Sequence, residues 1–416
     1  MTSKMAFRYI NISVRETRRS IIWSIVTKPT CVALLAFVFT VSGCAAEDLM
    51  TRARRIQSEV IGVDSHIDTL QRVLMEKADI GKRLSDGEVD LPRLREGGMH
   101  APFFALWVPT FYKGAEAIRR MLDLRDAVQS VFDRYPGEIE LATSAADVER
   151  IVRSHKIAAI LTLESGHEIN DDLAVLRMFQ RMGIRSMTLT HFRNNNWADS
   201  STDKPQHNGL TEFGKDVVRE MNRIGMIVDI SHVSDKTFYD TLAVTTKPVI
   251  ASHSSCRALS SLPRNMTDDM MRALGHNGGV VGINFGGGFL NQQQAEKELA
   301  NINQIGSAEP NLTGKALDDY TAAMWAKNDW RHPKPTVATL DDVIAHIDHV
   351  VKVAGIDHVG IGSDFDGISD VPRGLEDESK MPALTAALLQ RGYSEAGIKR
   401  IMGGNFLRVI REVIGK

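Results

Sequence analysis

The segment Gly62-Val63-Asp64-Ser65-His66-Ile67-Asp68 decides the fold that this sequence predicts. A short apolar run at 60–63 leads directly into side chains of the types that bind metal ions. His66 and Asp68 are two positions apart, and residues i and i+2 of a β-strand point to the same face. The two side chains can therefore aim at one point, as two ligands of a single metal ion must.

The same pattern recurs downstream, where five further apolar runs end in a side chain that can bind a metal or transfer a proton. These residues are Glu164, His191, His232, His253 and Asp364. In all, about eight apolar runs of strand length alternate with helical segments, which predicts a parallel sheet. Eight units over this length predict a (β/α)8 TIM barrel, whose active sites lie at the C-terminal rim of the strands. A doubly wound sheet is the alternative, but it would spread the strand ends along a line.

The composition excludes several functional classes. The 416 residues are 43% hydrophobic and 25% charged, which is ordinary for a soluble globular protein. A formal net charge of -2 argues against an electrostatic nucleic-acid binder. The chain has no Walker loop, and its three cysteines have no C-x-x-C spacing. We therefore expect one barrel domain at 59–416, with an insertion at 286–338 that is either a lid or a partner surface.

The first 45 residues have the features of an export signal. Basic residues precede an apolar stretch at 32–39 that is too short to be a comfortable membrane span. Val41-Ser42-Gly43-Cys44 follows and resembles the lipobox of bacterial lipoproteins, in which the cysteine is acylated. We expect a signal peptide at 1–43, lipidation of Cys44, and a tether at 44–58 that runs into a short helix. A plain secretory signal and an uncleaved anchor are the alternatives.

Lipidation of Cys44 predicts an exported protein that is lipid-anchored in the bacterial cell envelope. It would face the periplasmic side. Ala45 lacks the aspartate that would indicate retention in the inner membrane, so we expect the outer membrane.

The candidate ligands form a mixed set of three imidazoles and two carboxylates, namely His66, Asp68, Glu164, His232 and His253. Such donors suit zinc, and also iron, cobalt or manganese. Five ligands are too many for one catalytic zinc with an open position, but they suffice for two metals if Glu164 bridges them. Two metals can share an activated hydroxide, which indicates metal-assisted hydrolysis of an amide, ester or phosphoester. Asp364 would then be free to handle protons.

Several motifs together resemble the renal (membrane) dipeptidase family, a branch of the amidohydrolase superfamily of metal-dependent barrels. The resemblance covers most of residues 56–413. It rests on Asp64-Ser65-His66-Ile67-Asp68, Glu164-Ser165-Gly166-His167, Leu189-Thr190-His191, Asn196-Trp197-Ala198-Asp199-Ser200, Asp229-Ile230-Ser231-His232, Ser252-His253-Ser254-Ser255, Arg264-Asn265, Gly362-Ser363-Asp364-Phe365-Asp366-Gly367 and Gly403-Gly404-Asn405.

The resemblance implies a role for each residue that matches the family's motifs. Asp364 resembles the acid/base that takes a proton from the bridging water and passes it to the leaving amine. His191 resembles the residue that stabilises the oxyanion, and Arg264 the residue that holds the terminal carboxylate of the dipeptide, a job that suits a guanidinium. The ligands of two zinc ions would be His66, Asp68 and Glu164 for one, and Glu164, His232 and His253 for the other.

The expected function is therefore that of a binuclear zinc dipeptidase that cleaves dipeptides, including L-Xaa-D-Xaa, by attack of a metal-bridging hydroxide. Alternatives are a related hydrolase of lactones, N-acyl amino acids or phosphotriesters, and a non-catalytic envelope lipoprotein on the same barrel. A structural histidine at position 191 and a surface arginine at position 264 stay open, as does a homodimer. The family often has glycine at the position of Ser165, so we expect a slight change in pocket shape there.

Overall fold

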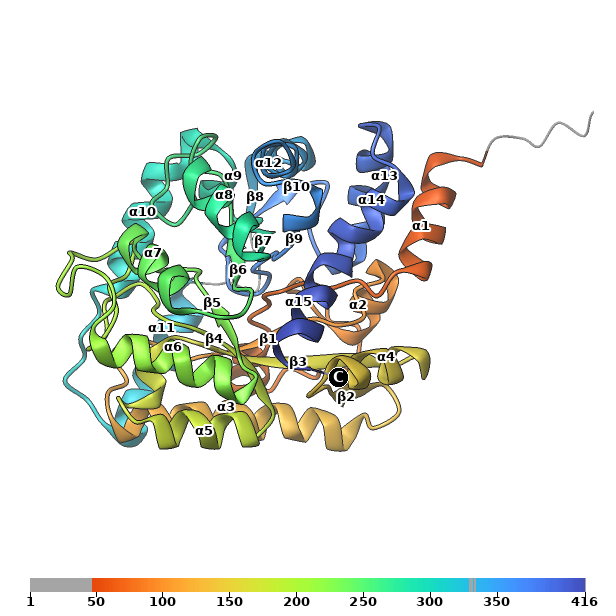
Figure 1. Ribbon diagram of the computed structural model, residues 1–416. Helices are drawn as coiled ribbons and strands as arrows, with labels where there is room; N and C mark the ends of the chain where they lie inside the picture. The colour runs from red at the N-terminus through yellow and green to blue at the C-terminus, as the bar shows by residue number, and fades with distance from the viewer. Residues whose placement is uncertain (1–46, 329–331, 333, 416) are drawn as a thin grey trace, which may run out of the picture. The chain divides into compact units, whose positions relative to one another are not determined.

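The computed structural model describes residues 47–328, 332 and 334–415. Strands of one parallel sheet follow each other around the centre in the order β1-β3-β4-β5-β6-β7-β9, and the short strand β2 pairs with β3 off this path (Figure 1). Their bounds are β1 (Phe103–Trp107), β2 (Ile139–Leu141), β3 (Ile157–Glu164), β4 (Ile184–Thr188), β5 (Ile227–Asp229), β6 (Ile250–Ser254), β7 (Val280–Ile283) and β9 (Val359–Ile361).

Residues 62–67 close the ring between β9 and β1. The apolar run at 60–63 and the i, i+2 spacing of His66 and Asp68 indicated a strand around 60–66, but this segment pairs only through isolated parallel bridges. Asp64 bridges to Ile361, and Ile67 bridges to Phe104. The Ser65 amide donates to the Ile361 carbonyl oxygen at 3.0 Å, which joins the first and last positions of the ring. The segment fills the eighth position, and the predicted (β/α)8 barrel is confirmed.

Helices follow the strands and surround the ring, as the alternation predicted (Figure 1). Two of them, α4 and α13, were not predicted. The helices outside the insertion are α1 (Leu49–Glu59), α2 (Leu91–Gly97), α3 (Ala115–Arg134), α4 (Ala145–Arg153), α5 (Leu173–Arg181), α6 (Glu212–Ile224), α7 (Asp235–Val244), α8 (Asp268–Asn277), α12 (Leu340–Val353), α13 (Met381–Gln390), α14 (Glu395–Lys399) and α15 (Asn405–Val413).

Local signals fix several helix ends. The Thr211 side chain accepts a hydrogen bond from the backbone of α6, and Gly225 ends this helix with φ 70°, where a side chain would be strained. A capping box starts α12, where Asp342 Oδ2 accepts from the Thr339 amide at 2.8 Å. These caps satisfy backbone groups that helix ends leave unpaired.

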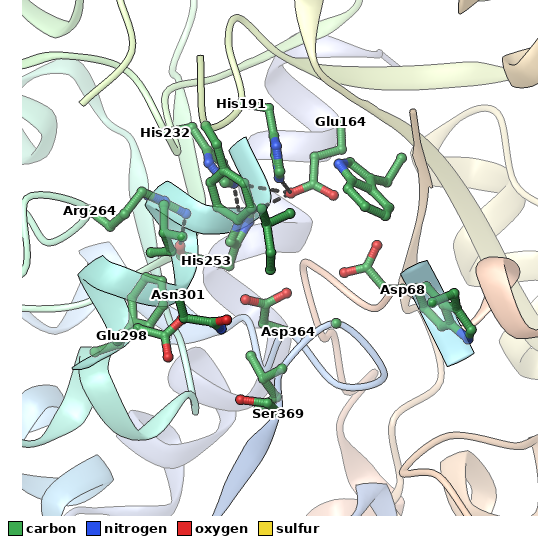
Figure 2. Close-up of a pocket in the computed structure, with 18 residues that line it drawn as sticks. Asp68, Glu164, His191, His232, His253, Arg264, Glu298, Asn301, Asp364 and Ser369 are labelled. Atoms are coloured by element: carbon green, nitrogen blue, oxygen red, sulfur yellow. Dashed lines mark hydrogen bonds and ion pairs between the residues drawn. The ribbon is translucent and has the colours of Figure 1, made fainter. Parts of the chain in front are cut away.

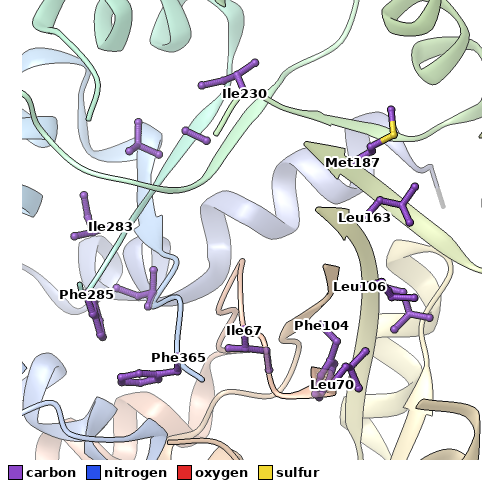
Figure 3. Close-up of a cluster of buried hydrophobic side chains, with 14 of the residues drawn as sticks. Ile67, Leu70, Phe104, Leu106, Leu163, Met187, Ile230, Ile283, Phe285 and Phe365 are labelled. Carbon is purple, nitrogen blue, oxygen red and sulfur yellow. The ribbon is translucent and has the colours of Figure 1, made fainter. Parts of the chain in front are cut away.

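The core follows from the apolar runs. All eight residues of β3 are buried, as expected for a parallel strand that is covered on both faces. Figure 3 shows how side chains far apart in the sequence gather around the closing segment, with Ile67 between Phe104 and Phe365. All three are fully buried, so the apolar side chain of Ile67 anchors the closing segment in the core.

The predicted tether at 44–58 is a folded element over most of its length. Helix α1 buries Ala53, Ile56 and Gln57 and packs against α13. Gln57 donates from Nε2 to the Gly97 carbonyl oxygen at 2.7 Å, which ties α1 to the end of α2. Most residues of this stretch are polar, so its narrow buried face, which includes Ala53 and Ile56, was not recognised from the sequence. This face packs α1 onto the barrel domain.

The insertion at 286–338 contains more regular structure than we predicted. It forms three helices, α9 (Gly287–Leu290), α10 (Gln292–Gly306) and α11 (Gly314–Asn328), of which the sequence indicated only a helix near 316–327. Strand β8 (Lys334–Thr339) then pairs in parallel with β10 (Asp370–Arg373). Helix α10 is rich in Gln and Asn, and it buries only a few side chains, so its periodicity is weak in the sequence.

The export signal, the proposed lipidation site Cys44 and the start of the tether lie outside the described residues. Within the described part of the chain, no helix combines the length and the apolar character needed to cross a bilayer.

Candidate metal centre

The structure brings all the predicted barrel-site residues to one end of the ring. Glu164 ends β3, His253 lies in β6, and His191, His232 and Asp364 follow β4, β5 and β9. Figure 2 shows these side chains converging on one pocket, with Asp68 entering from the closing segment and Arg264 from the loop after β6. His66 completes the group and is fully buried. The C-terminal ends of parallel strands therefore deliver the set, as the barrel predicts.

The Glu164 carboxylate lies at the middle of this group. Its Oε2 atom is 3.3 Å from His66 Nε2, on one side. Its Oε1 atom is 3.1 Å from His232 Nε2 and 3.3 Å from His253 Nε2, on the other. The two oxygens therefore have different nearest imidazoles, and one carboxylate can serve two neighbouring cations. His253 also lies close to His66, since these two residues and Glu164 can be grouped around one point.

Asp68 completes the donor set on the His66 side. Its Oδ2 atom is 3.5 Å from His66 Nε2, and its Oδ1 atom has no hydrogen-bond partner. Both ring nitrogens of His66 are buried and also lack such a partner. Buried polar atoms are normally satisfied, so these orphaned atoms fit a metal ion that completes their contacts. Burial lowers the pKa of His66, but the Glu164 and Asp68 carboxylates outweigh it and raise this pKa well above the usual value.

The neighbours of His253 determine which of its ring nitrogens is protonated. Ser252 Oγ donates its only proton to Asp229 Oδ2 and lies 2.7 Å from His253 Nδ1. The hydroxyl must therefore accept from Nδ1–H, which leaves the lone pair on Nε2. This lone pair lies on the Glu164 side, where a metal would need it. Asp229 and Ser252 belong to the quoted motifs, but their supporting role was not predicted from the sequence.

His232 and His253 aim at the same point. Their Nε2 atoms are 2.8 Å apart, and both rings are almost fully buried. Burial, followed by the nearby Arg264 charge for His232 and the His66 charge for His253, holds both pKa values well below the ordinary value. Neutral imidazoles are the form that binds metals. His232 has φ 69°, a strained conformation for a non-glycine residue of the kind that clusters at functional sites.

His191 is nearly as close to Glu164 as the expected ligands are. Its Nε2 atom lies 3.6 Å from Glu164 Oε1, and the metal-type cluster on that side can be drawn with Glu164, His191 and His232. Its ring lies against Phe192, with centroids 3.9 Å apart. His191 therefore lines the pocket beside Glu164, and its role in stabilising the oxyanion stays a prediction.

Asp364 is held at the centre of the pocket. Its Oδ2 atom accepts a hydrogen bond from Asn284 Nδ2 at 2.8 Å, and its φ of 65° is another strained backbone value. Burial, opposed by His66 and supported by the Asp68 charge, raises the pKa of Asp364 to about 7. A carboxyl with this pKa can both accept and donate a proton near neutral pH. Asn284 directly follows β7, so the strand-end pattern could have identified it.

Asp366, two residues after Asp364, holds neighbouring segments together. Its Oδ2 atom accepts from Thr69 Oγ1 at 2.6 Å, and its Oδ1 atom accepts from the Glu88 amide at 2.9 Å. It is fully buried and does not line the pocket. Of these two aspartates, only Asp364 lines the pocket.

Arg264 is a buried arginine, which excludes the alternative of a surface residue. Its side chain packs over the Phe289 ring, and Nη2 donates to the His253 carbonyl oxygen at 3.2 Å. Its Nε atom has no partner, and no carboxylate of the described residues lies within ion-pair distance. Burial lowers its pKa to about 10, so it remains cationic at neutral pH. Free donors on a buried cation are suited to binding an anionic group of a ligand.

The structure also shows where Cys256 and Ser165 lie relative to the pocket. Cys256 is fully buried and does not line the pocket, as expected for a small core residue. Ser165 is buried just behind Glu164 with φ 147°, a region that favours glycine, and its Oγ lies 2.7 Å from His167 Nδ1. Ser165 does not line the pocket. The expected slight change in pocket shape therefore stays a prediction.

Comparison with known proteins agrees with this geometry. The family model described as membrane dipeptidase, peptidase family M19, matches residues 50–415. The dipeptidase tcpJ of Claviceps purpurea is 39% identical over 337 residues, which cover 79% of this chain and 69% of that protein.

Two solved structures share the fold over most of this chain. The probable dipeptidase PvdM from Pseudomonas aeruginosa has a TM-score of 0.74 and 27% identity, with 88% of this chain and 98% of that chain covered. A metallopeptidase from Rhodobacter sphaeroides, solved with a phosphinate mimic of the dipeptide L-Ala-D-Ala, has a TM-score of 0.70 and 26% identity, with 85% and 99% covered.

Proposed function

Because the chain belongs to the membrane dipeptidase family, peptidase family M19, we propose that it hydrolyses dipeptides at a centre of two zinc ions. One observation carries the proposal. The two oxygens of Glu164 have different nearest imidazoles, His66 for Oε2 and both His232 and His253 for Oε1.

The donor chemistry supports zinc. His66 and Asp68 would hold one ion and His232 and His253 the other, with Glu164 shared between them. Imidazole nitrogens and carboxylate oxygens are common zinc ligands. When bound, the two ions supply an activated water at neutral pH and polarise the substrate carbonyl.

The other residues of the pocket supply binding and proton transfer. Asp364 accepts the proton of the attacking water and returns it to the leaving amine, a cycle suited to its pKa of about 7. His191 stands beside the carbonyl oxygen that gains charge, and the buried guanidinium of Arg264 holds the free carboxylate of the dipeptide. A carboxylate clamp near the metals favours substrates of two residues.

The stereochemical preference is part of the proposal. We expect a D-residue at the C-terminal position to be accepted alongside an L-residue. The Rhodobacter sphaeroides metallopeptidase, which was solved with an L-Ala-D-Ala mimic, supports this expectation by its similarity to this chain.

The test combines metal analysis with a dipeptide panel on one sample of residues 47–416. We expect two metal ions per chain, hydrolysis of several L-Xaa-L-Xaa and L-Xaa-D-Xaa dipeptides, and loss of activity with a chelator that added zinc restores. Full activity in the metal-free protein would refute the proposal. The Arg264→Ala variant should lose productive binding of free-carboxylate substrates, whereas a phosphotriester hydrolase would not be affected.

The proposed location is the periplasmic side of a bacterial envelope, with the outer membrane favoured and Cys44 lipidated. The motif Val41-Ser42-Gly43-Cys44 supports it. The full-length protein should fractionate with membranes, and Cys44→Ala should release it or leave it unprocessed. Equal membrane association of both forms, with no lipid on Cys44 by mass spectrometry, would contradict the proposal.

A further inference from the structure

Helix α10 of the insertion covers one side of the pocket with a single face. Glu298, Asn301, Ile302 and Ile305 all line the pocket, and their spacing places them on one stripe of the helix. Trp325 of α11 lines the same pocket. The insertion therefore belongs to the substrate site.

Glu298 is a carboxylate in this pocket without a positively charged partner. Among the described residues, no Lys or Arg lies within ion-pair distance of it and no hydrogen bond to it is formed. By contrast, Asp318 and Asp319 of the next helix, α11, pair with Arg119 and Lys315. In Figure 2, Glu298 and Asn301 lie on the opposite side of Asp364 from Glu164, near Arg264. Its stem is held in place because the Cβ and Cγ atoms pack closely over Gly288.

The electrostatics of this part of the pocket favour a cation. Burial, followed by the Asp370 and Asp364 charges, raises the pKa of Glu298 to about 7. Lys297 and Arg264 oppose this shift without cancelling it. A cation placed here would restore the ionised form of Glu298 and gain a charge-assisted hydrogen bond.

We propose that Glu298 selects dipeptides whose C-terminal residue carries a positively charged side chain, such as lysine or arginine. The inference rests on the proposed function, in which Arg264 holds the C-terminal carboxylate. The C-terminal side chain branches from the carbon that bears this carboxylate, so it begins beside Arg264 and can extend toward Glu298. The α-ammonium of the substrate is not the expected partner, because it adjoins the scissile carbonyl and must stay near the Glu164 centre.

The remaining residues of the α10 face suit the same side chain. A lysine or arginine stem is apolar, and Ile302 and Ile305 offer apolar surface beside Glu298. The Asn301 carboxamide oxygen, one turn along the helix from Glu298, can accept a second hydrogen bond from the cationic end.

The experiment compares kcat/KM for Ala-Lys, Ala-norleucine, Ala-Glu and Lys-Ala. Norleucine has nearly the length of lysine but no charge, so the ratio of Ala-Lys to Ala-norleucine isolates the ammonium group. We expect this ratio to be about 10 or more in the wild-type protein, as for one buried charge-assisted contact. Ala-Glu should be the poorest substrate, and Lys-Ala should show no such advantage.

Three variants locate the effect. Glu298→Gln keeps the stem over Gly288 and should bring the ratio of Ala-Lys to Ala-norleucine to about 1. Glu298→Lys should favour Ala-Glu over Ala-Lys. Glu296→Gln removes an exposed acid from the same helix and should leave the ratio unchanged. Thermal unfolding of each variant confirms that the fold is retained.

The outcomes separate this inference from the proposed function. Hydrolysis of Ala-norleucine with no preference for Ala-Lys, or a preference that survives in Glu298→Gln, overturns the role of Glu298 and leaves the dipeptidase intact. A preference for Lys-Ala over Ala-Lys also overturns it, because the cation would then belong to the other residue. Failure to hydrolyse any dipeptide overturns the proposed function and this inference with it.

Discussion

The strand-end rim and the α10 face of the insertion meet at the same pocket but differ in construction. Rim side chains such as Glu164 and His253 are almost fully buried and held by neighbours on adjacent strands. On α10, Glu298 is only partly buried and has no charged partner among the described residues. Dense mutual contacts fix positions within fractions of an ångström, which a reaction centre requires. We infer that the rim determines the reaction and that the insertion determines which dipeptide reaches it.

The variant with the largest expected effect is at Glu164, and it tests whether the strand-end rim determines the reaction. Glu164→Gln should remove one charge from both proposed metal sites, so both ions should be lost or weakened together. Activity on every dipeptide should fall by about 1,000-fold or more, since several kcal/mol of charge stabilisation disappear. Metal analysis of the variant is the direct measurement. Retention of two tightly bound ions would show that Glu164 is not shared.

Asp364→Asn should separate proton transfer from metal binding. The amide cannot cycle a proton, so kcat should fall by at least about 100-fold, whereas metal content should stay at the wild-type value. The loss should be the same for charged and neutral dipeptides, because Asp364 acts on the scissile bond. A loss confined to Ala-Lys would instead place Asp364 with Glu298 in substrate selection.

The hydroxyl behind His253 should have a smaller effect. Ser252→Ala removes the acceptor of Nδ1–H and the link to Asp229. We expect metal affinity to fall by roughly 10- to 100-fold, as for other groups that orient a ligand, with activity restored by excess zinc. Ser254→Ala, on the same strand, is the matched control because its hydroxyl faces the Arg264 carbonyl. Equal loss in both variants would indicate general damage to β6.

The smallest expected effect concerns backbone strain at the rim. Ser165 has φ 147°, which glycine adopts more easily. Ser165→Gly should raise the free energy of unfolding by about 1 kcal/mol, the lower end of the usual range for such strain. Kinetic constants should change less than about twofold, because the side chain does not line the pocket. A lower melting temperature would show that the Ser165–His167 hydrogen bond outweighs the strain.

The sequence by itself indicated the eight barrel strands, most of the helices that alternate with them, and the candidate site residues at the strand ends. A buried parallel strand reads as an unbroken apolar run, and its C-terminal end is marked where a polar residue such as Glu164 or His232 follows. Helix ends were readable for the same reason, since a cap such as Thr339 with Asp342 involves only neighbouring residues. Motif resemblance then assigned roles that spacing alone left open.

Only the tertiary structure decided how these pieces meet. The closing segment at 62–67 has too few backbone pairs to be a regular strand, and its place depends on β1 and β9, which are distant in the sequence. The link from Asp229 through Ser252 to His253, and the placement of Glu298 in the pocket, likewise depend on closure of the ring and packing of the insertion. Local patterns report short-range preferences, whereas distances between atoms on different strands follow from the packing of the whole barrel.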